Sequence, residues 1–331
     1  MPTRQAVVIE AFGGPEVLHL ITEETPALEP GLIRVAIEAI GVNRADILLR
    51  TGAYHGVQPP ARPGLEAAGV VVESCAARLP VGSRVVIFGN RKGLYVTEAV
   101  VHEDEVALLP EAVTTTTAAA LPVNWLTAWY CLHRLIRLRP DDTLLIPAAA
   151  SGVGTAAIQI ARHVGATVIA AASSAEKLAF AARLGANITV NYAEINLLEA
   201  LRDITENKGV TAFLDTVGGQ TFADGLKALA PFGRVAALAN VTLEPSLINV
   251  RDFYPKNAHI YGFQLGNLMA AGRYPEARTD LEGILAHVAQ GVFQVPIAGT
   301  FPLAAAAAAH ARLESRTVMG KLLLITTQGT A

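Results

Sequence analysis

Short runs of apolar residues, separated by turn residues, characterise the first third of the chain. Between Ile33 and Glu38, apolar and polar residues alternate, as in a strand with one face in water. The Gly13-Gly14-Pro15 segment is typical of a turn. This pattern predicts a compact, irregular β-barrel or sandwich with strands at Ala6–Glu10, Leu32–Ile40, Gly69–Ser74, Ser83–Phe88 and Gly93–Val101.

From about residue 114 the pattern changes to helices that alternate with short apolar strands. Helices are expected at Thr115–Arg137, Gly154–Val164, Ala175–Leu184, Leu197–Thr205 and Gln220–Leu229. Strands are expected at Thr143–Pro147, Thr167–Ala171, Ile188–Asn191, Ala212–Asp215 and Val235–Ala239. The alternation predicts an α/β domain with a doubly wound parallel sheet.

A third stretch closes the chain. It predicts a helix at Tyr274–Gln290, a β-like segment at Phe293–Ile297, an alanine-rich helix at Leu303–Leu313 and a last strand at Lys321–Ile325. The simplest closure returns this tail to the N-terminal domain, so that the α/β domain is an insertion. We therefore predict one domain from residues 1–123 and 266–331 and a second from residues 124–265.

Composition narrows the classes of function. The 331 residues carry a formal charge of −3, which gives no basic excess for a phosphate backbone and argues against nucleic acid as a primary partner. The two cysteines suit a reducing compartment. Charges, Gly or Pro interrupt every apolar stretch before the roughly 18 residues that a membrane span needs. Since Met1–Glu10 also lacks an export signal, we predict a cytoplasmic protein that does not enter a membrane.

The segment at residues 144–162 carries the most informative chemistry. An apolar strand leads through a turn of small residues into a helix, which directs backbone N–H groups at one point, as a pyrophosphate requires. Measured against G-x-G-x-x-G, the three positions are Ala149, Ser151 and Gly154, so only the third glycine is kept. An ordinary tight turn remains the alternative.

The exit of the next strand bears on which cofactor binds. Enzymes that use NAD place a carboxylate there for the ribose hydroxyls, but residues 171–174 contain no acid. Ser173, Ser174 and Lys177 offer hydroxyls and a positive charge, which suit a 2′-phosphate. The sequence therefore favours NADPH, although Ser174 can also cap the following helix.

Four segments in order carry a family resemblance: Gly41-Val42-Asn43-Arg44-Ala45-Asp46, Pro63-Gly64-Leu65-Glu66-Ala67-Ala68-Gly69, the turn at 149–154 and Asp215-Thr216-Val217-Gly218-Gly219. They resemble the medium-chain dehydrogenase/reductase superfamily, and within it the zinc-independent quinone oxidoreductase (zeta-crystallin-like) branch. The resemblance covers essentially the whole chain. It implies a Rossmann-type sheet inserted in a GroES-like, mostly β catalytic domain, and a homodimer.

The resemblance also bears on the metal. Zinc enzymes of the superfamily bind the metal through a Cys after Gly-Val and a His in Gly-His-Glu, and Asn43 and Leu65 stand at those places here. Leucine cannot ligate zinc, and an amide is a poor ligand beside thiolate and imidazole. We therefore expect no metal. Without a metal to activate an alcohol, the substrate is expected to be a small electrophile that accepts hydride readily, such as a quinone, enone or alkenal.

In the catalytic domain, the resemblance implies that Asn43 and Tyr54 donate hydrogen bonds to the substrate oxygen. Asp46 is expected to cap a helix. Leu48 replaces a tyrosine often seen in this segment, which suggests a more apolar pocket. The implied cofactor residues are Thr127, Ser151, Gly152, Val153, Gly154, Ser173, Ser174, Lys177, Tyr192, Asn240, Phe263 and Lys321.

These observations predict an NADPH-dependent reductase of quinones or α,β-unsaturated carbonyls that transfers hydride without a metal. A 2-enoyl thioester reductase is the alternative enzyme, because related modules share the fold and lack zinc. A non-enzymatic NADPH-binding protein with a structural or regulatory role is a third possibility.

Overall fold

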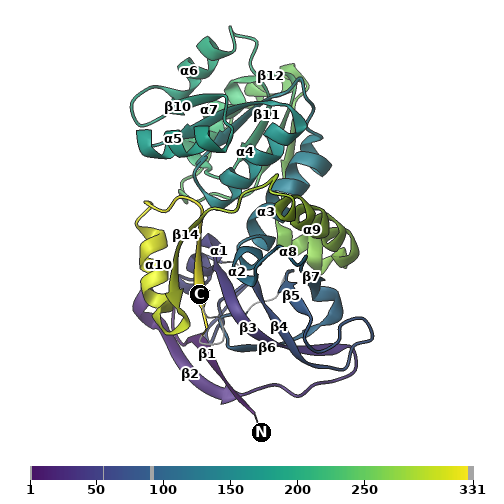
Figure 1. Ribbon diagram of the computed structural model, residues 1–331. Helices are drawn as coiled ribbons and strands as arrows, with labels where there is room; N and C mark the ends of the chain where they lie inside the picture. The colour runs from purple at the N-terminus through teal and green to yellow at the C-terminus, as the bar shows by residue number, and fades with distance from the viewer. Residues whose placement is uncertain (1, 55, 90–92, 327–331) are drawn as a thin grey trace. The chain divides into compact units, whose positions relative to one another are not determined.

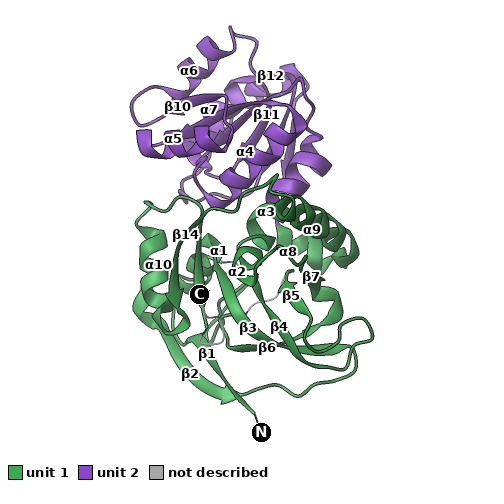
Figure 2. Cartoon of the chain, in the orientation of Figure 1, with its two compact units in different colours: residues 1–126, 265–331 green, residues 127–264 purple. Residues whose placement is uncertain are grey.

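A computed structural model describes residues 2–54, 56–89 and 93–326. The chain forms two compact units, drawn in different colours in Figure 2. Unit 1 contains the chain up to residue 126 and again from residue 265, and unit 2 contains residues 127–264. The sequence predicted that the two domains meet between residues 123 and 124 and between residues 265 and 266.

Unit 1 is built on two antiparallel-rich sheets. The larger has the order β14-β15-β3-β4-β5-β7, with β6 also paired to β3, and the smaller pairs β1 with β2. Strand β3 is the longest and pairs with β15, β4 and β6. The strands are β1 (Thr3–Ile9), β2 (Leu18–Glu24), β3 (Leu32–Val42), β4 (Ala67–Ser74), β5 (Arg84–Ile87), β6 (Glu98–His102), β7 (Val106–Leu108), β14 (Ile297–Pro302) and β15 (Lys321–Ile325).

Helices of unit 1 lie beside these sheets (Figure 1). The α-helices are α1 (Arg44–Arg50), α2 (Thr115–Ala119), α8 (Leu265–Ala270), α9 (Tyr274–Ala289) and α10 (Ala306–Glu314). Short 3-10 turns span Pro15–Val17, Glu103–Glu105 and Leu303–Ala305. Helix α3 (Pro122–Trp129) begins in unit 1 and ends in unit 2.

Unit 2 has a six-stranded parallel sheet in the order β10-β9-β8-β11-β12-β13. Its strands are β8 (Thr143–Pro147), β9 (Thr167–Ala172), β10 (Ile188–Asn191), β11 (Val210–Asp215), β12 (Leu229–Ala237) and β13 (His259–Gly262). From β8 the chain proceeds outward to β10 and then returns to continue outward through β11 on the other side. The strand order therefore reverses between β8 and β11, and ligands of such sheets bind at the carboxyl ends of the strands near this point.

Helices connect these parallel strands. They are α4 (Gly152–Val164), α5 (Ala175–Leu184), α6 (Leu197–Ile204) and α7 (Gly219–Lys227). A π-helical turn at Tyr130–Ile136 precedes β8, and 3-10 turns at Val250–Asp252 and Tyr254–Lys256 lie between β12 and β13. Helices α4 and α5 contact each other, as do α6 and α7. The helices thus form two pairs, as in a doubly wound domain, and the predicted fold class is confirmed.

Some predicted elements were wrong. The β-like segment at Phe293–Ile297 is not a strand, because Phe293 packs on Trp125 with ring centroids 5.0 Å apart, and the strand begins only at Ile297. The single helix expected at 115–137 is divided, with a new helix beginning at Pro122. Strand β2 was missed. Among the residues that the structure describes, none of the helices has the length and apolar character of a membrane span.

Candidate functional site

The turn between β8 and α4 presents free backbone donors at the carboxyl edge of the unit 2 sheet. Ser151 caps α4, since its Oγ accepts a hydrogen bond from the Gly154 N–H over 3.1 Å. A Cβ at Gly154 would lie 2.6 Å from the Ala149 carbonyl oxygen, so this close approach requires glycine. Among the described residues, the N–H groups of Gly152 and Val153 have no partner. These two donors, at the positive end of a helix, fit a pyrophosphate.

The exits of β9 and β10 bring together the predicted 2′-phosphate residues. Lys177 Nζ lies 3.4 Å from Ser173 Oγ, and the Lys177 N–H donates to Ser174 Oγ over 3.4 Å. The Tyr192 N–H donates to the Ala172 carbonyl over 3.2 Å, which joins the end of β10 to the end of β9. Two hydroxyls and an ammonium therefore share one edge where no carboxylate stands at 171–174. This donor set fits a phosphate dianion.

The segment that follows β11 is a tight turn around a buried carboxylate. Asp215 accepts hydrogen bonds from the N–H groups of Val217 and Gly218, each over 3.1 Å. Burial raises the pKa of Asp215 to about 6, and these two donors oppose that rise. A Cβ at Gly218 would lie 2.5 Å from Asn240 Oδ1, so glycine lets the turn approach the loop after β12.

Three further predicted cofactor residues lie in unit 2. Phe263 follows β13 and stacks on Tyr130, with ring centroids 4.8 Å apart. Asn240 follows β12, and its Nδ2 donates to the Glu244 carbonyl within the same loop over 2.8 Å. Thr127 is half-buried on α3. The parallel topology places Asn240 and Phe263 at the same edge of the sheet as the exits of β9 and β10.

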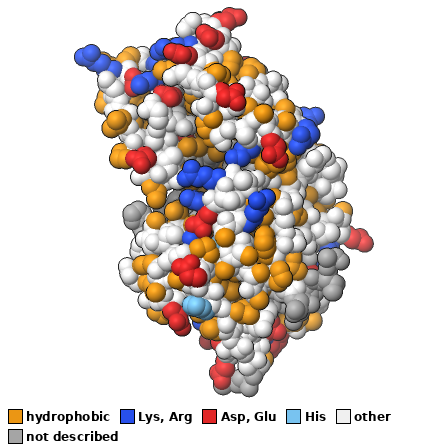
Figure 3. Space-filling view, turned by 90° about the vertical axis from the view of Figure 1, so that its left-hand side faces the viewer, with side chains coloured by type: hydrophobic (Ala, Val, Ile, Leu, Met, Phe, Trp, Pro, Cys, Tyr) orange, Lys and Arg blue, Asp and Glu red, His pale blue; other side chains and the backbone are white. Residues whose placement is uncertain are grey.

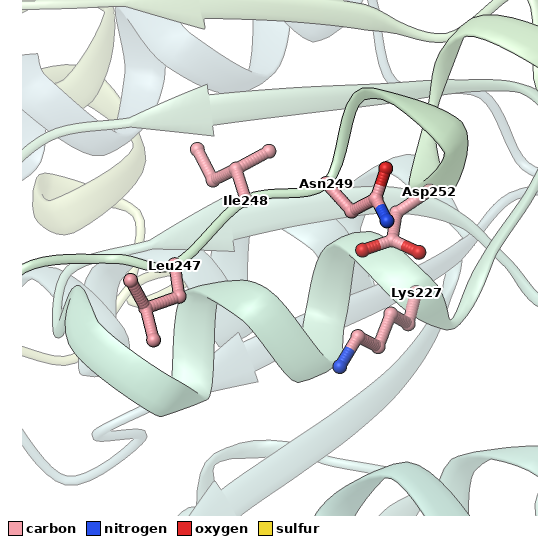
Figure 4. Close-up of a pocket in the computed structure, with 5 residues that line it drawn as sticks. All are labelled: Lys227, Leu247, Ile248, Asn249 and Asp252. Carbon is pink, nitrogen blue, oxygen red and sulfur yellow. The ribbon is translucent and has the colours of Figure 1, made fainter.

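A separate pocket lies at the other end of this sheet. It is lined by Lys227, Leu247, Ile248, Asn249 and Asp252 (Figure 4). Lys227 ends α7 shortly before β12 begins, and the start of β12 is level with the start of β11. The pocket therefore lies toward the amino ends of the strands, away from the turn between β8 and α4.

In unit 1, Asn43 stands at the start of α1 and is held by Asp46. One oxygen of Asp46 accepts the Asn43 N–H over 2.9 Å, and the other accepts the Gly64 N–H over 2.8 Å. Asp46 is fully buried, and burial raises its pKa to about 6 against the effect of these two donors. The predicted capping role of Asp46 is confirmed. The carboxylate additionally anchors the segment that contains Leu65.

A buried ion pair lies beside Asn43. Lys321, the first residue of β15, pairs through Nζ with Glu66 Oε1 and lies 2.6 Å from Asn43 Oδ1. Asn43 Nδ2 donates to the same Glu66 oxygen over 2.8 Å, and the other oxygen accepts the Val123 N–H over 2.6 Å. The three residues are 5%, 0% and 4% exposed for Asn43, Glu66 and Lys321. The sequence singled out Asn43 and Lys321, but nothing in it indicated that Glu66 joins them.

Tyr54 lies on the loop that follows α1. Its backbone N–H donates to the Leu48 carbonyl over 3.0 Å, and its side chain packs against the small cluster of Ile9, Leu49 and Ala61. Asn43 and Tyr54 thus stand beyond opposite ends of a helix about 10 Å long. That both donate to one substrate oxygen stays a prediction.

A second chain of buried polar groups continues from Asp46 and was not predicted. Tyr95 Oη lies 3.4 Å from Asp46 Oδ2 and 3.1 Å from His310 Nε2, and His310 Nδ1 lies 3.4 Å from Arg50 Nη1. Because arginine only donates, Nδ1 accepts, and the ring proton is on Nε2 and directed at Tyr95. Desolvation and the charge of Arg50 lower the pKa of His310 to about 3, so its ring is neutral. Arg50 also pairs with Glu314 over 2.6 Å.

Two arginine side chains of unit 1, Arg44 and Arg316, make no hydrogen bond or ion pair within the described ranges. The Nε of Arg44 is buried, and desolvation followed by the like charge of Arg316 lowers the pKa of Arg44, while the negative charge of Glu314 opposes this shift. Unpaired guanidinium groups suit an anionic ligand. The sequence did not single out either residue, although Arg44 directly follows Asn43.

Charge is mixed on one face of the molecule. On the face drawn in Figure 3, Lys and Arg side chains are interspersed with Asp and Glu, and apolar side chains lie between them. This distribution agrees with the small net charge of the sequence.

This chain is similar to known proteins over nearly its whole length. Residues 29–111 match the family described as alcohol dehydrogenase GroES-like domain, and residues 152–282 match the family described as zinc-binding dehydrogenase. The chain is 33% identical to quinone oxidoreductase 1 of Escherichia coli over 98% of this chain and 100% of that protein. It is 33% identical to a 2-haloacrylate reductase of a Burkholderia species, over 97% and 98% of the two chains. A crystal structure of E. coli quinone oxidoreductase complexed with NADPH superposes with a TM-score of 0.90 at 33% identity, over 97% and 99%.

A GroES-like unit, a parallel sheet with a phosphate-binding turn and the two family matches define a dehydrogenase/reductase of the medium-chain type. Within that superfamily, the chain belongs to the quinone oxidoreductase branch, as its full-length relatives show. The predicted resemblance is confirmed.

Proposed function

We propose that this chain is an oxidoreductase that uses NADPH to reduce quinones or α,β-unsaturated carbonyl compounds. The observation that carries the proposal is the grouping of Ser173, Ser174 and Lys177 at the exit of β9 in a member of the quinone oxidoreductase family. The E. coli relative was crystallised with NADPH, and the Burkholderia relative is a 2-haloacrylate reductase by name. Both names describe reductases of conjugated acceptors.

Residues of unit 2 are assigned to the parts of the cofactor. The free N–H groups of Gly152 and Val153 bind the pyrophosphate. Ser173 and Lys177 bind the 2′-phosphate, and Tyr192 contacts the adenine. Thr127, Asn240 and Phe263 serve the nicotinamide half. When bound, NADPH supplies the hydride.

The acceptor is served by hydrogen-bond donors of unit 1. Asn43 and Tyr54 are assigned to the substrate oxygen, where negative charge develops as hydride arrives. A conjugated acceptor spreads that charge itself, so orientation and a few donors suffice. No metal is required, because Leu65 offers no ligand and Glu66 is already paired with Lys321. Among the described residues, no group of three or more His, Cys, Asp and Glu side chains could hold a metal ion.

A panel of acceptors tests this function. NADPH oxidation is followed by absorbance with ortho- and para-quinones, enones, alkenals, 2-haloacrylate and a crotonyl thioester. We expect turnover with at least one quinone or enone. Turnover with the thioester alone would instead support a 2-enoyl thioester reductase, and bound NADPH that no acceptor oxidises would support a non-enzymatic role.

We further propose that two copies associate through β13. This strand is an edge of the unit 2 sheet, and its outward N–H and C=O groups can pair with the same strand of a second copy around a two-fold axis. Ile260 on β13 is 39% exposed, and Leu247, Val250 and Tyr254 in the preceding segment are 81%, 58% and 60% exposed. Such apolar exposure is typical of an interface. Ile260→Lys should convert a dimer to a monomer in sedimentation, and an unchanged dimer would contradict this interface.

We also propose that the protein is located in the cytoplasm. The Cys75 thiol is exposed and the Cys131 thiol is buried, and both are free cysteines, which suits a reducing compartment. Fractionation of cells that express the protein tests this assignment, and recovery outside the cytoplasm would contradict it.

A further inference from the structure

The Lys321 ammonium has an unusual setting for a residue expected on the cofactor side. It is almost fully buried and two of its three donors are engaged, one by Glu66 and one by the Asn43 carbonyl oxygen. The Asn43 amide nitrogen directs one proton to Glu66 over 2.8 Å and lies 3.4 Å from the Gly41 carbonyl. One Asn43 proton is therefore firmly bound and the other only weakly.

This setting fixes which way the Asn43 amide points. With an ammonium on one side and a carboxylate on the other, only one orientation of the amide matches donors to acceptors. The flipped amide would place its NH₂ against the ammonium and its oxygen against the carboxylate, leaving buried groups unsatisfied. An ammonium on the amide oxygen also polarises the group and strengthens its remaining N–H as a donor.

We propose that Lys321 is a positioning residue for the reduction: it fixes the orientation and the donor strength of the Asn43 amide instead of binding the cofactor. The proposal rests on the proposed function, because it assumes that Asn43 serves the substrate oxygen. The weakly engaged Asn43 proton is the one available to that oxygen.

The first test compares Lys321→Met with the matched variant Lys177→Met. We expect Lys321→Met to lower kcat about tenfold to a hundredfold and to change the Kd for NADPH, measured by fluorescence, less than about threefold. Lys177→Met should show the reverse split, with the Kd for NADPH weakened about tenfold or more and kcat lowered less than in Lys321→Met. If Lys321→Met weakens NADPH binding about tenfold or more and leaves kcat intact, Lys321 binds the cofactor and the proposal fails.

Lys321→Met leaves Glu66 buried without a counter-charge, so a second variant removes both charges. Lys321→Met/Glu66→Gln should fold and should keep the kcat defect, because the amide oxygen still lacks its ammonium partner. Recovery of kcat to the wild-type value would show that Lys321 only compensates the charge of Glu66, and would overturn the proposal.

A readout without turnover separates this inference from the proposed function. In protein labelled with ¹⁵N at asparagine side chains, the Asn43 amide protons should exchange with water at least about tenfold faster in Lys321→Met, which keeps the Glu66 acceptor, than in the wild type. Equal exchange rates would contradict a positioning role even in an active enzyme. If no acceptor in the panel supports NADPH oxidation by the wild type, but the variant still exchanges faster than the wild type, the proposed function fails while the local role of Lys321 stands.

Discussion

The carboxyl edge of the unit 2 sheet and the buried polar cluster of unit 1 are built on different principles. At the edge, groups such as the Gly152 N–H and the Lys177 ammonium come from neighbouring positions in sequence and remain accessible. In the cluster, Lys321 meets Asn43 across 278 positions and His310 meets Tyr95 across 215, and these groups satisfy one another away from water.

The difference separates binding from positioning. Donors that have no partner within the protein are free to hold a ligand, and local backbone signals suffice to arrange them. Donors that are satisfied internally, such as the Lys321 ammonium, do not hold the ligand themselves, but they fix a neighbouring group such as the Asn43 amide, which keeps one weakly engaged proton for the substrate. Damage to the cluster should therefore reduce stability and kcat, whereas damage to the edge should reduce cofactor affinity.

The largest effect is expected from Glu66→Ala. Removing this carboxylate leaves the buried Lys321 charge without a partner, which costs about 3–5 kcal/mol of unfolding free energy. Urea unfolding measures this loss. Glu206→Ala, which removes an exposed partner of Lys208, serves as the control and should be nearly neutral. Equal effects of the two variants would contradict the contrast between the cluster and the surface.

The pH dependence of stability should reveal His310. The pKa of His310 is lowered to about 3 in the folded protein from 6.5, so the unfolded chain takes up the proton first as the pH falls. The stability that His310 contributes is complete above about pH 6.5 and is lost toward pH 3, on the order of 3 kcal/mol between pH 7 and pH 4. The advantage of the wild type over His310→Asn should shrink by that amount on acidification.

The contribution of Asp46 to the pH dependence of stability has the opposite sign. Its pKa is raised in the folded protein, so its protonation between about pH 6 and pH 4 favours the folded state. The comparison of wild type with His310→Asn at each pH isolates the histidine, since both proteins retain Asp46. A constant difference between them from pH 7 to pH 4 would refute the neutral, buried state of His310.

A smaller effect is expected at the exit of β9. Lys177→Ala removes one charged contact to the 2′-phosphate, worth about 1–3 kcal/mol, and should raise the Michaelis constant for NADPH about tenfold to a hundredfold. The constant for NADH should barely change, because NADH has no 2′-phosphate. Steady-state kinetics with both cofactors provides the comparison, and equal effects would rule out the assignment.

The smallest effect is expected from Ser151→Ala. Loss of the hydrogen bond from the Gly154 N–H to Ser151 Oγ removes the cap of α4 and should destabilise the protein by about 1 kcal/mol. Ser174→Ala, which removes the corresponding cap of α5, is the matched variant for thermal unfolding. Stability should fall in both variants, because each loses a helix cap. Only Ser151→Ala also changes the turn assigned to the pyrophosphate. No loss in either would contradict the capping geometry.

Local signals account for what the sequence predicted. Four predicted elements agree with the structure, because the ends of apolar strands and capped helices are marked by local residue patterns. They are Thr143–Pro147, Ala175–Leu184, Ile188–Asn191 and Lys321–Ile325. Tertiary packing accounts for the error at Phe293, whose ring pairs with Trp125 far away in sequence.

Within the candidate site, the same distinction holds. Ser173, Ser174, Lys177 and the capping role of Asp46 follow from residue types at short spacing. The contact of Lys321 with Glu66 depends on β15 pairing with β3, and no pattern near either residue indicates it. His310 stands alone in an alanine-rich helix, so its hydrogen bonds to Tyr95 and Arg50 were not visible before the fold was known.

One measurement tests the central claim most directly: kcat/KM for NADPH and for NADH, determined side by side with a quinone and with an enone in the presence of a metal chelator. We predict that NADPH exceeds NADH by about tenfold or more with at least one acceptor, and that the chelator has no effect. Equal use of the two cofactors, or loss of turnover when the chelator is added, would contradict the account.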